Sequence, residues 1–226
     1  VPIGGYLTGG SIWHSQCGES IFAHVPGLVV AFPSRARDAV GLLRTAFLAE
    51  DPVLFCEHKH LLRQPYAADP YPPDDFVVPF GKGAVRRPGR HLTVVTWGAT
   101  VQRSLVAADA IAAGGQGPEV EVIDLRTISP WDHDLVGESV RRTGRALVVH
   151  EDVAAWQHGL SMFSATPSCT EIDRPNSRLG MFIGFQPPQS KAPPVEARRG
   201  STVKLEDMVP MDSMCTSATP LSMKTI

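Results

Sequence analysis

The sequence has 226 residues, 43% hydrophobic and 19% charged, which is enough for one large or two small domains with buried cores. Its formal net charge of −2 gives no reason to expect nucleic acid or an anionic membrane as a partner, and no apolar run approaches the ~18 residues of a membrane span. The four cysteines are widely separated and form no CxxC pair, so reduced thiols are expected.

The first predicted unit is a strand, a helix and a second strand. Residues 28–32 are a continuous apolar run, which is typical of a buried strand in a parallel sheet. Ser34 follows where a helix N-cap is wanted. The helix is expected to bury one stripe, made of Ala39, Val40, Leu42, Leu43, Ala46 and Phe47. Pro52 ends it, and residues 53–56 form the next strand, so a right-handed parallel crossover is predicted.

Residues 63–80 are predicted to be an extended linker between two domains. Residues 65–79 contain five prolines, and proline disrupts both helices and strand ladders. The boundary is therefore placed here, with a first domain over residues 1–62 and a second over residues 81–153.

The second predicted unit alternates strands and helices. Three apolar runs indicate strands, at residues 92–97, 120–123 and 146–149. A helix over residues 99–113 ends at a glycine pair, and a second helix begins at a cap by Asp132 and ends at Gly144. Parallel strands with alternating helices form a doubly wound, three-layer αβα domain, which is incomplete at His150.

Residues 154–226 form an atypical tail, rich in Ser, Pro and Met. All six methionines of the chain lie at or beyond Met162. No window sustains a helix or strand period for long, although residues 181–185 would suit a short strand. Two interpretations stay open: a disordered extension, or a shifted reading frame or foreign join beginning near Val153.

Three local patterns could suggest chemical sites, and each has a simpler structural explanation. His58 and His60 share one face of a strand end, but two histidines without a third ligand are more often a polar strand end than a metal site. Cys17 lies near His14 without the third group that an activated cysteine needs. The Gly-rich residues 4–10 lack the strand before and the helix after that a phosphate loop requires.

Four polar residues come at the carboxyl ends of predicted second-domain strands: Asp124, Arg126, His150 and Glu151. Ligands of open α/β sheets bind at this edge, so these residues are candidates for a site.

Eight stretches follow one another in order along roughly residues 3–153. They are His14-Ser15-Gln16, Phe22-Ala23-His24-Val25-Pro26-Gly27-Leu28, Asp38-Ala39-Val40-Gly41-Leu42-Leu43, Pro52-Val53-Leu54-Phe55 with Glu57, Pro79-Phe80-Gly81-Lys82-Gly83, Thr93-Val94-Val95-Thr96-Trp97-Gly98, Val122-Ile123-Asp124-Leu125-Arg126-Thr127 and Val149-His150-Glu151. In sequence and spacing, this ordered set resembles the beta subunit of branched-chain 2-oxo acid and pyruvate dehydrogenases, within the transketolase-like group.

The resemblance implies a fold, a function and partners. The fold is α/β: part of a parallel-sheet pyrimidine-binding domain in residues 1–62, then a doubly wound transketolase C-terminal-like domain. The implied function is a component of a complex that oxidatively decarboxylates a 2-oxo acid and transfers the acyl group to lipoyl-lysine. Implied partners are an alpha subunit or domain, a second beta subunit and the lipoyl acyltransferase core, in the bacterial cytoplasm or the mitochondrial matrix. Asp124, Arg126, His150 and Glu151 would then serve docking or structure.

The resemblance also implies thiamine diphosphate as cofactor. In such enzymes the beta subunit binds its aminopyrimidine half, and the alpha subunit binds its diphosphate and magnesium. The beta-subunit glutamate and the stacking aromatic that contact the pyrimidine precede the Gly-rich loop, so no cofactor-binding residue is assigned here, and the isolated chain is expected to be inactive. His14 matches the family's active-site histidine and is expected to assist acyl transfer, a role suited to imidazole near pH 7.

Many family members hold a potassium ion through backbone carbonyls near the end of the helix that precedes Pro52. The matching carbonyls belong to Ala46, Phe47 and Asp51. The resemblance therefore implies a potassium site there.

Two alternative functions stay open. Transketolase and deoxyxylulose-phosphate-synthase relatives typically have a Gly-Pro-Thr-His type sequence at this point, whereas residues 12–16, Ile-Trp-His-Ser-Gln, favour the dehydrogenase. The other alternative is a non-catalytic fragment that acts only in subunit association.

Overall fold

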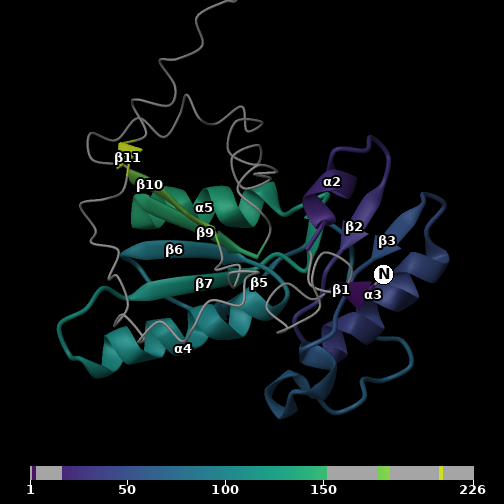
Figure 1. The fold of residues 1–226 in the computed structure, drawn as a ribbon, viewed down its shortest axis with the longest axis horizontal. Coiled ribbons are helices and arrows are strands. Elements are labelled where there is room, and N and C mark those ends of the chain that lie inside the picture. The colour runs from purple at the N-terminus through teal and green to yellow at the C-terminus, as the bar shows by residue number, and fades with distance from the viewer. Residues whose placement is uncertain (1, 4–16, 152–177, 184–208, 211–226) are drawn as a thin grey trace, which may run out of the picture.

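The computed structural model describes residues 2–3, 17–151, 178–183 and 209–210. Within them lie a short two-stranded pairing, a three-stranded sheet and a six-stranded sheet (Figure 1). The Gly-rich loop, His14 and most of the tail predicted for residues 154–226 lie outside the described residues.

The three-stranded sheet confirms the predicted strand, helix and strand of the first unit. It also contains one strand from the second unit. Its parallel pair and crossover helix are β2 (Val29–Ala31), α3 (Ala36–Leu48) and β3 (Val53–Phe55). The third strand is β8 (Thr127–Ser129), which is antiparallel to β2 although it belongs by sequence to the second unit. A short helix α2 (Glu19–Ala23) contacts β2, and β1 (Pro2–Ile3) pairs with β4 (Glu57–His58). β8 therefore ties the two units together.

Helix α3 differs from its prediction in its N-cap and in the burial of its apolar stripe. Arg35, not Ser34, occupies the N-cap position, and the hydroxyl of Ser34 donates instead to Asp124. On the predicted apolar stripe Leu42 is fully buried, whereas Leu43 and Phe47 are 42% and 82% exposed. Local periodicity alone could not show how much of this stripe the three-stranded sheet would cover.

The segment predicted as an extended linker packs against α3 in the structure. It begins with two 3₁₀ turns, η1 (Leu61–Arg63) and η2 (Pro65–Ala67). Arg44 donates to the carbonyl of Phe76 at 3.0 Å, and Thr45 donates to the carbonyl of Val78 at 2.8 Å. The prolines remove backbone donors from this segment, but α3 side chains satisfy its carbonyls, so it is a fixed part of the fold.

The second sheet contains the three predicted parallel strands and three more. In order across the sheet its strands are β11 (Val209–Pro210), β10 (Arg178–Ile183), β9 (Arg145–His150), β6 (Leu92–Thr96), β7 (Val120–Asp124) and β5 (Ala84–Arg87). β5 and β11 are antiparallel to their neighbours, and β10 is parallel to β9. The sequence predicted a sheet that is incomplete at His150. In the structure β10 extends the sheet, because it pairs along the whole of β9.

Two helices cover opposite faces of this sheet, α4 (Ala99–Ala113) and α5 (His133–Thr143) (Figure 1). The caps of α5 are as predicted: the Asp132 carboxylate accepts from the N–H of Leu135 at 3.1 Å, and Gly144 ends the helix at φ 70°. Across the described part of the chain, no helix combines the length and apolar character needed to cross a membrane.

The main hydrophobic core spans both units. First-unit side chains such as Val30, Phe32 and Cys56 belong to the same buried cluster as Val95 and Val148 of the second sheet. A smaller cluster lies between α4 and the other face of the sheet, formed by Val94, Ala108, Val120 and Val122. The two units are therefore fixed against each other by shared apolar burial.

Gly98 makes the turn from β6 into α4, and its conformation leads to a stability prediction. Its φ of 56° and ψ of −135° lie where L-residues are strained, and a Cβ would stand 2.9 Å from the ring of Phe32. Gly98→Ala is expected to lower the free energy of unfolding by at least ~1–3 kcal/mol, measured by urea denaturation. Gly114→Ala, at the other end of α4 with φ −71°, is the control and should be nearly neutral.

Candidate functional site at the junction of the two sheets

The topology of the second sheet marks one edge as a place for a site. β6 lies between β7 and β9, and the crossover to β7 runs over one face while the crossover to β9 runs over the other (Figure 1). The connections thus diverge between β6 and β9, and ligands of such sheets bind outside the carboxyl ends at that point. Trp97 follows β6 there, His150 is the last residue of β9, and Glu151 follows it.

A first-unit residue reaches this edge of the sheet. The indole of Trp97 stacks on the ring of His150 with centroids 5.3 Å apart, and its Nε1 donates to Glu19 of α2 at 3.0 Å. All three side chains are buried. A buried first-unit carboxylate is therefore hydrogen-bonded at the edge where sheets of this topology bind ligands.

Beside this array, Cys17, His58 and Glu151 converge from three distant segments. The Glu151 Oε2 atom lies 2.7 Å from Nε2 of His58 and 3.8 Å from Sγ of Cys17. One sulfur, one ring nitrogen and one carboxylate oxygen, each from a different residue of the three, lie within 4.8 Å of one another. The second carboxylate oxygen of Glu151 is buried and has no hydrogen-bond partner among the described residues.

The backbone determines the tautomer of His58. The N–H of His60 donates to Nδ1 of His58 at 3.2 Å. A backbone N–H can only donate, so Nδ1 is an acceptor, His58 is neutral, and its hydrogen is on Nε2. His58 therefore donates to Glu151, and Glu151 is a largely buried carboxylate that faces a neutral ring.

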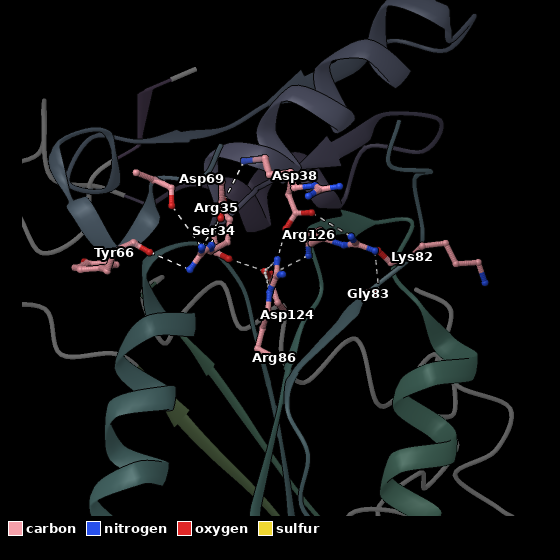
Figure 2. Close-up of polar contacts among 12 residues, drawn as sticks. Ser34, Arg35, Asp38, Tyr66, Asp69, Lys82, Gly83, Arg86, Asp124 and Arg126 are labelled. Atoms are coloured by element: carbon pink, nitrogen blue, oxygen red, sulfur yellow. Dashed lines mark hydrogen bonds and ion pairs between the residues drawn. The ribbon is translucent and has the colours of Figure 1, made fainter. Parts of the chain in front are cut away.

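A second polar cluster joins the units through Arg86 of β5 (Figure 2). Its guanidinium forms ion pairs with Asp38 of α3 and with Asp124 at the end of β7, the latter at 2.8 Å. Arg126 pairs with Asp38 at 3.2 Å and also donates to the carbonyls of Lys82 and Gly83. One arginine from the second unit thus bridges carboxylates from both units.

Asp124 is the most buried member of this Arg86 cluster, with a fully buried side chain. Its carboxylate accepts from Ser34 at 2.5 Å, from Arg86 and from the backbone N–H of Arg126. Burial raises the pKa of Asp124, and Arg86 opposes that shift. Because donors occupy both oxygens, the arrangement supports a structural role for Asp124.

Arg35, at the start of α3, binds the segment of residues 63–80 through Asp69. This ion pair predicts that the stability of the protein depends on pH. The guanidinium of Arg35 forms a bidentate pair with Asp69 and donates to the carbonyl of Tyr66 at 3.0 Å (Figure 2). The hydrogen bond from Arg35 lowers the pKa of Asp69. A depressed carboxyl pKa contributes stability above the unfolded value of about 3.9, which is lost as the pH falls through the folded pKa.

Asp69→Asn should therefore reduce stability at pH 7 but progressively less below about pH 3.9. The check is urea denaturation of both proteins between neutral and strongly acid pH. A stability difference that stays constant over this range would contradict the assignment.

The sequence-predicted site residues have different outcomes. His14 lies outside the described residues, so its role stays a prediction. The carbonyls proposed for potassium belong to the last turn of α3 and to Asp51, which follows it. The carbonyl of Ala46 accepts from the N–H of Ala49 at 3.4 Å, and the residues Phe47 and Asp51 are exposed. The potassium site also stays a prediction.

The structure changes the partners of His58. The rings of His58 and His60 are 6.3 Å apart, edge to face, and His60 reaches His58 through its backbone. The side chain of His58 instead contacts Glu151, which is 93 residues away in the sequence. Glu151 in turn contacts Cys17, which is 134 residues away from it. No local pattern carries such a signal; the position of Glu151 after a predicted strand was its only indication in the sequence.

Comparisons with known proteins agree with this architecture. Residues 2–65 match the family model "transketolase, pyrimidine binding domain" and residues 81–204 match "transketolase, C-terminal domain". The 2-oxoisovalerate dehydrogenase subunit beta of Bacillus subtilis is 43% identical over 151 residues, which cover 67% of this chain and 45% of that subunit. The pyruvate dehydrogenase E1 component subunit beta of Rhizobium meliloti is 43% identical over 138 residues, covering 61% and 29%.

A solved split-gene transketolase, described as an inactive beta4 tetramer, shares the fold. It superposes with a TM-score of 0.60 at 20% identity over 80% of this chain and 55% of that one. The chain thus spans less than half the length of the two dehydrogenase subunits it matches.

Proposed function

This chain belongs to the transketolase family, and we propose that it forms part of the beta subunit of a 2-oxo acid dehydrogenase. In the complete enzyme, together with an alpha subunit, it would take part in decarboxylating a 2-oxo acid and passing the acyl group to lipoyl-lysine. The observation that supports this most is the 43% identity over 151 residues to a subunit of that kind. The proposed compartment is the bacterial cytoplasm or the mitochondrial matrix.

Thiamine diphosphate, when bound to such an enzyme, supplies the carbanion-stabilising chemistry that decarboxylation requires. Each buried glutamate of the described chain already has a protein partner. Glu19 accepts from Trp97, Glu121 is paired with Arg142, and Glu151 accepts from His58. We therefore assign no cofactor contact to the described residues, and place the cofactor, with its magnesium, on other parts of the complete enzyme.

His14 is the residue of this chain that we propose acts on the reacting groups. A neutral imidazole can donate from one nitrogen and accept at the other, so it can deliver a proton to a lipoyl sulfur as the acyl group is transferred. The second sheet and the Arg86 cluster would hold the two units in the relative position that this site requires.

The test is a chimera. The matching segment of the Bacillus subtilis 2-oxoisovalerate dehydrogenase beta subunit is replaced by that of this chain and co-expressed with its alpha subunit. Decarboxylation of 2-oxoisovalerate and of pyruvate is then measured with a lipoyl domain as acceptor. Turnover of either substrate is the expected result, and the preferred one identifies the substrate. A chimera that assembles with the alpha subunit but turns over neither would contradict the proposal.

The potassium ion is part of the same proposal. The last carbonyls of α3 lie at the negative end of the helix dipole, which suits a hard cation held by oxygen atoms. Potassium chloride should therefore raise the thermal midpoint of the chain above that in sodium chloride at equal ionic strength. Equal midpoints in the two salts over a wide concentration range would remove the ion from the proposal.

A further inference from the structure

Cys17, His58 and Glu151 bring together the three kinds of atom that proteins use to bind zinc. A thiol sulfur, an imidazole nitrogen and a carboxylate oxygen lie within 4.8 Å of one another, and Cys17 and His58 are buried. Ligand atoms around a tetrahedral zinc ion lie roughly 3.3–3.7 Å apart, given bond lengths of about 2.0–2.3 Å. The sulfur–oxygen separation of 3.8 Å is already close to this, and the nitrogen–oxygen separation of 2.7 Å would have to open slightly.

The charge of the cluster also favours a cation. His58 is neutral because its Nδ1 accepts from the N–H of His60. Within the described residues, Glu151 forms no ion pair with a lysine or arginine, although its side chain is only 10% exposed. A buried carboxylate without a cation is unfavourable, and its second oxygen, Oε1, is buried without a hydrogen-bond partner in the same part of the chain.

From this geometry we infer that Cys17, His58 and Glu151 form a binding site for a divalent transition-metal ion of the zinc type. The mixed sulfur, nitrogen and oxygen set selects such an ion over magnesium or calcium, which prefer oxygen alone. The thiolate and the carboxylate balance its two positive charges. The second oxygen of Glu151 or a water molecule completes four-fold coordination.

Metal binding changes the position of two protons, one on Cys17 and one on His58. The metal takes the place of two hydrogens that now point at Glu151 Oε2. The Cys17 thiol loses its proton to solvent, and the hydrogen of His58 moves from Nε2 to Nδ1. Nδ1 then becomes a donor and opposes the N–H of His60, so the His60 amide weakens the site.

The test uses the full chain and Co²⁺, whose bond to a thiolate gives a near-ultraviolet charge-transfer band. The wild-type chain should take up one equivalent and show that band. Cys17→Ser should abolish the band and weaken binding by at least the roughly 10–100-fold that loss of an outer-sphere partner costs. Cys56→Ser is the matched control, because Cys56 is a second buried cysteine that is not part of this cluster, and the band should persist.

A second pair of variants tests the role of the His60 amide. His60 has a φ of −64°, which proline can adopt, so His60→Pro removes the opposing N–H and should tighten Co²⁺ binding. His60→Ala removes the imidazole but keeps the N–H and should bind as the wild type does. The inference fails if the wild type shows no band, if the band survives Cys17→Ser, or if His60→Ala abolishes it.

Discussion

Arg86→Met is expected to lower the free energy of unfolding by about 3–5 kcal/mol. The substitution removes the cation between Asp38 and Asp124, whose side chains are 8% and 0% exposed, and leaves two buried carboxylates near each other. Breaking a buried ion pair on one side costs about this much, because Asp124 is then a buried carboxylate without a cation, whereas Asp38 keeps its ion pair with Arg126. Urea denaturation of the purified chain measures the effect.

Arg90→Met is the matched control for Arg86. Arg90 pairs with Glu119 at 2.7 Å, but both side chains are largely in solvent, so only a small change is expected. Adding Asp124→Asn to Arg86→Met should recover part of the lost stability, because it removes one uncompensated charge. Equal stability of Arg86→Met and wild type would show that the cluster does not hold the units together.

His14→Ala is expected to slow lipoyl acylation by ~10²–10⁴-fold in the chimeric enzyme assembled with its alpha subunit. The reason is the loss of a positioned proton donor at the acyl-transfer step. Affinity for thiamine diphosphate should change much less, because the pyrimidine contacts are assigned to other residues. Single-turnover assays with a lipoyl domain and calorimetric titration of the cofactor separate the two effects.

His24→Ala serves as the control for His14, since His24 is an exposed histidine ten residues further along the same chain. It should acylate the lipoyl domain at the rate of the unsubstituted chimera. The assignment of His14 would be rejected if His14→Ala retained that rate, or if it lost activity only by losing cofactor affinity.

Local patterns in the sequence were sufficient for most of the regular structure. Apolar runs bounded by proline or glycine identified β2, β3, β6, β7 and β9, because a strand buried on both faces needs apolar side chains on both. The helix periodicity and the caps at Asp132 and Gly144 located α5. The ordered motifs indicated the family, because each is continuous in the sequence and can be identified without knowledge of the fold.

Only the tertiary structure decided which of these elements meet. β8 crosses from the second unit to pair with β2, and the tail strand β10 pairs with β9. Ser34 shows the competition at one residue: a local rule predicts an N-cap, but a buried carboxylate 90 residues away accepts its hydrogen at 2.5 Å. A hydrogen bond to a carboxylate is stronger than one between neutral groups, and this one directs the Ser34 hydroxyl to Asp124.

The metal-type site depended on tertiary structure in the same way. Cys17, His58 and Glu151 come from three segments that the junction of the two sheets brings together, and each of them alone has an ordinary structural explanation. Sequence spacing reports a site only when its ligands share one helix, strand or loop. Here shared apolar burial between the two units brings the ligands together, and that packing is a property of the whole fold.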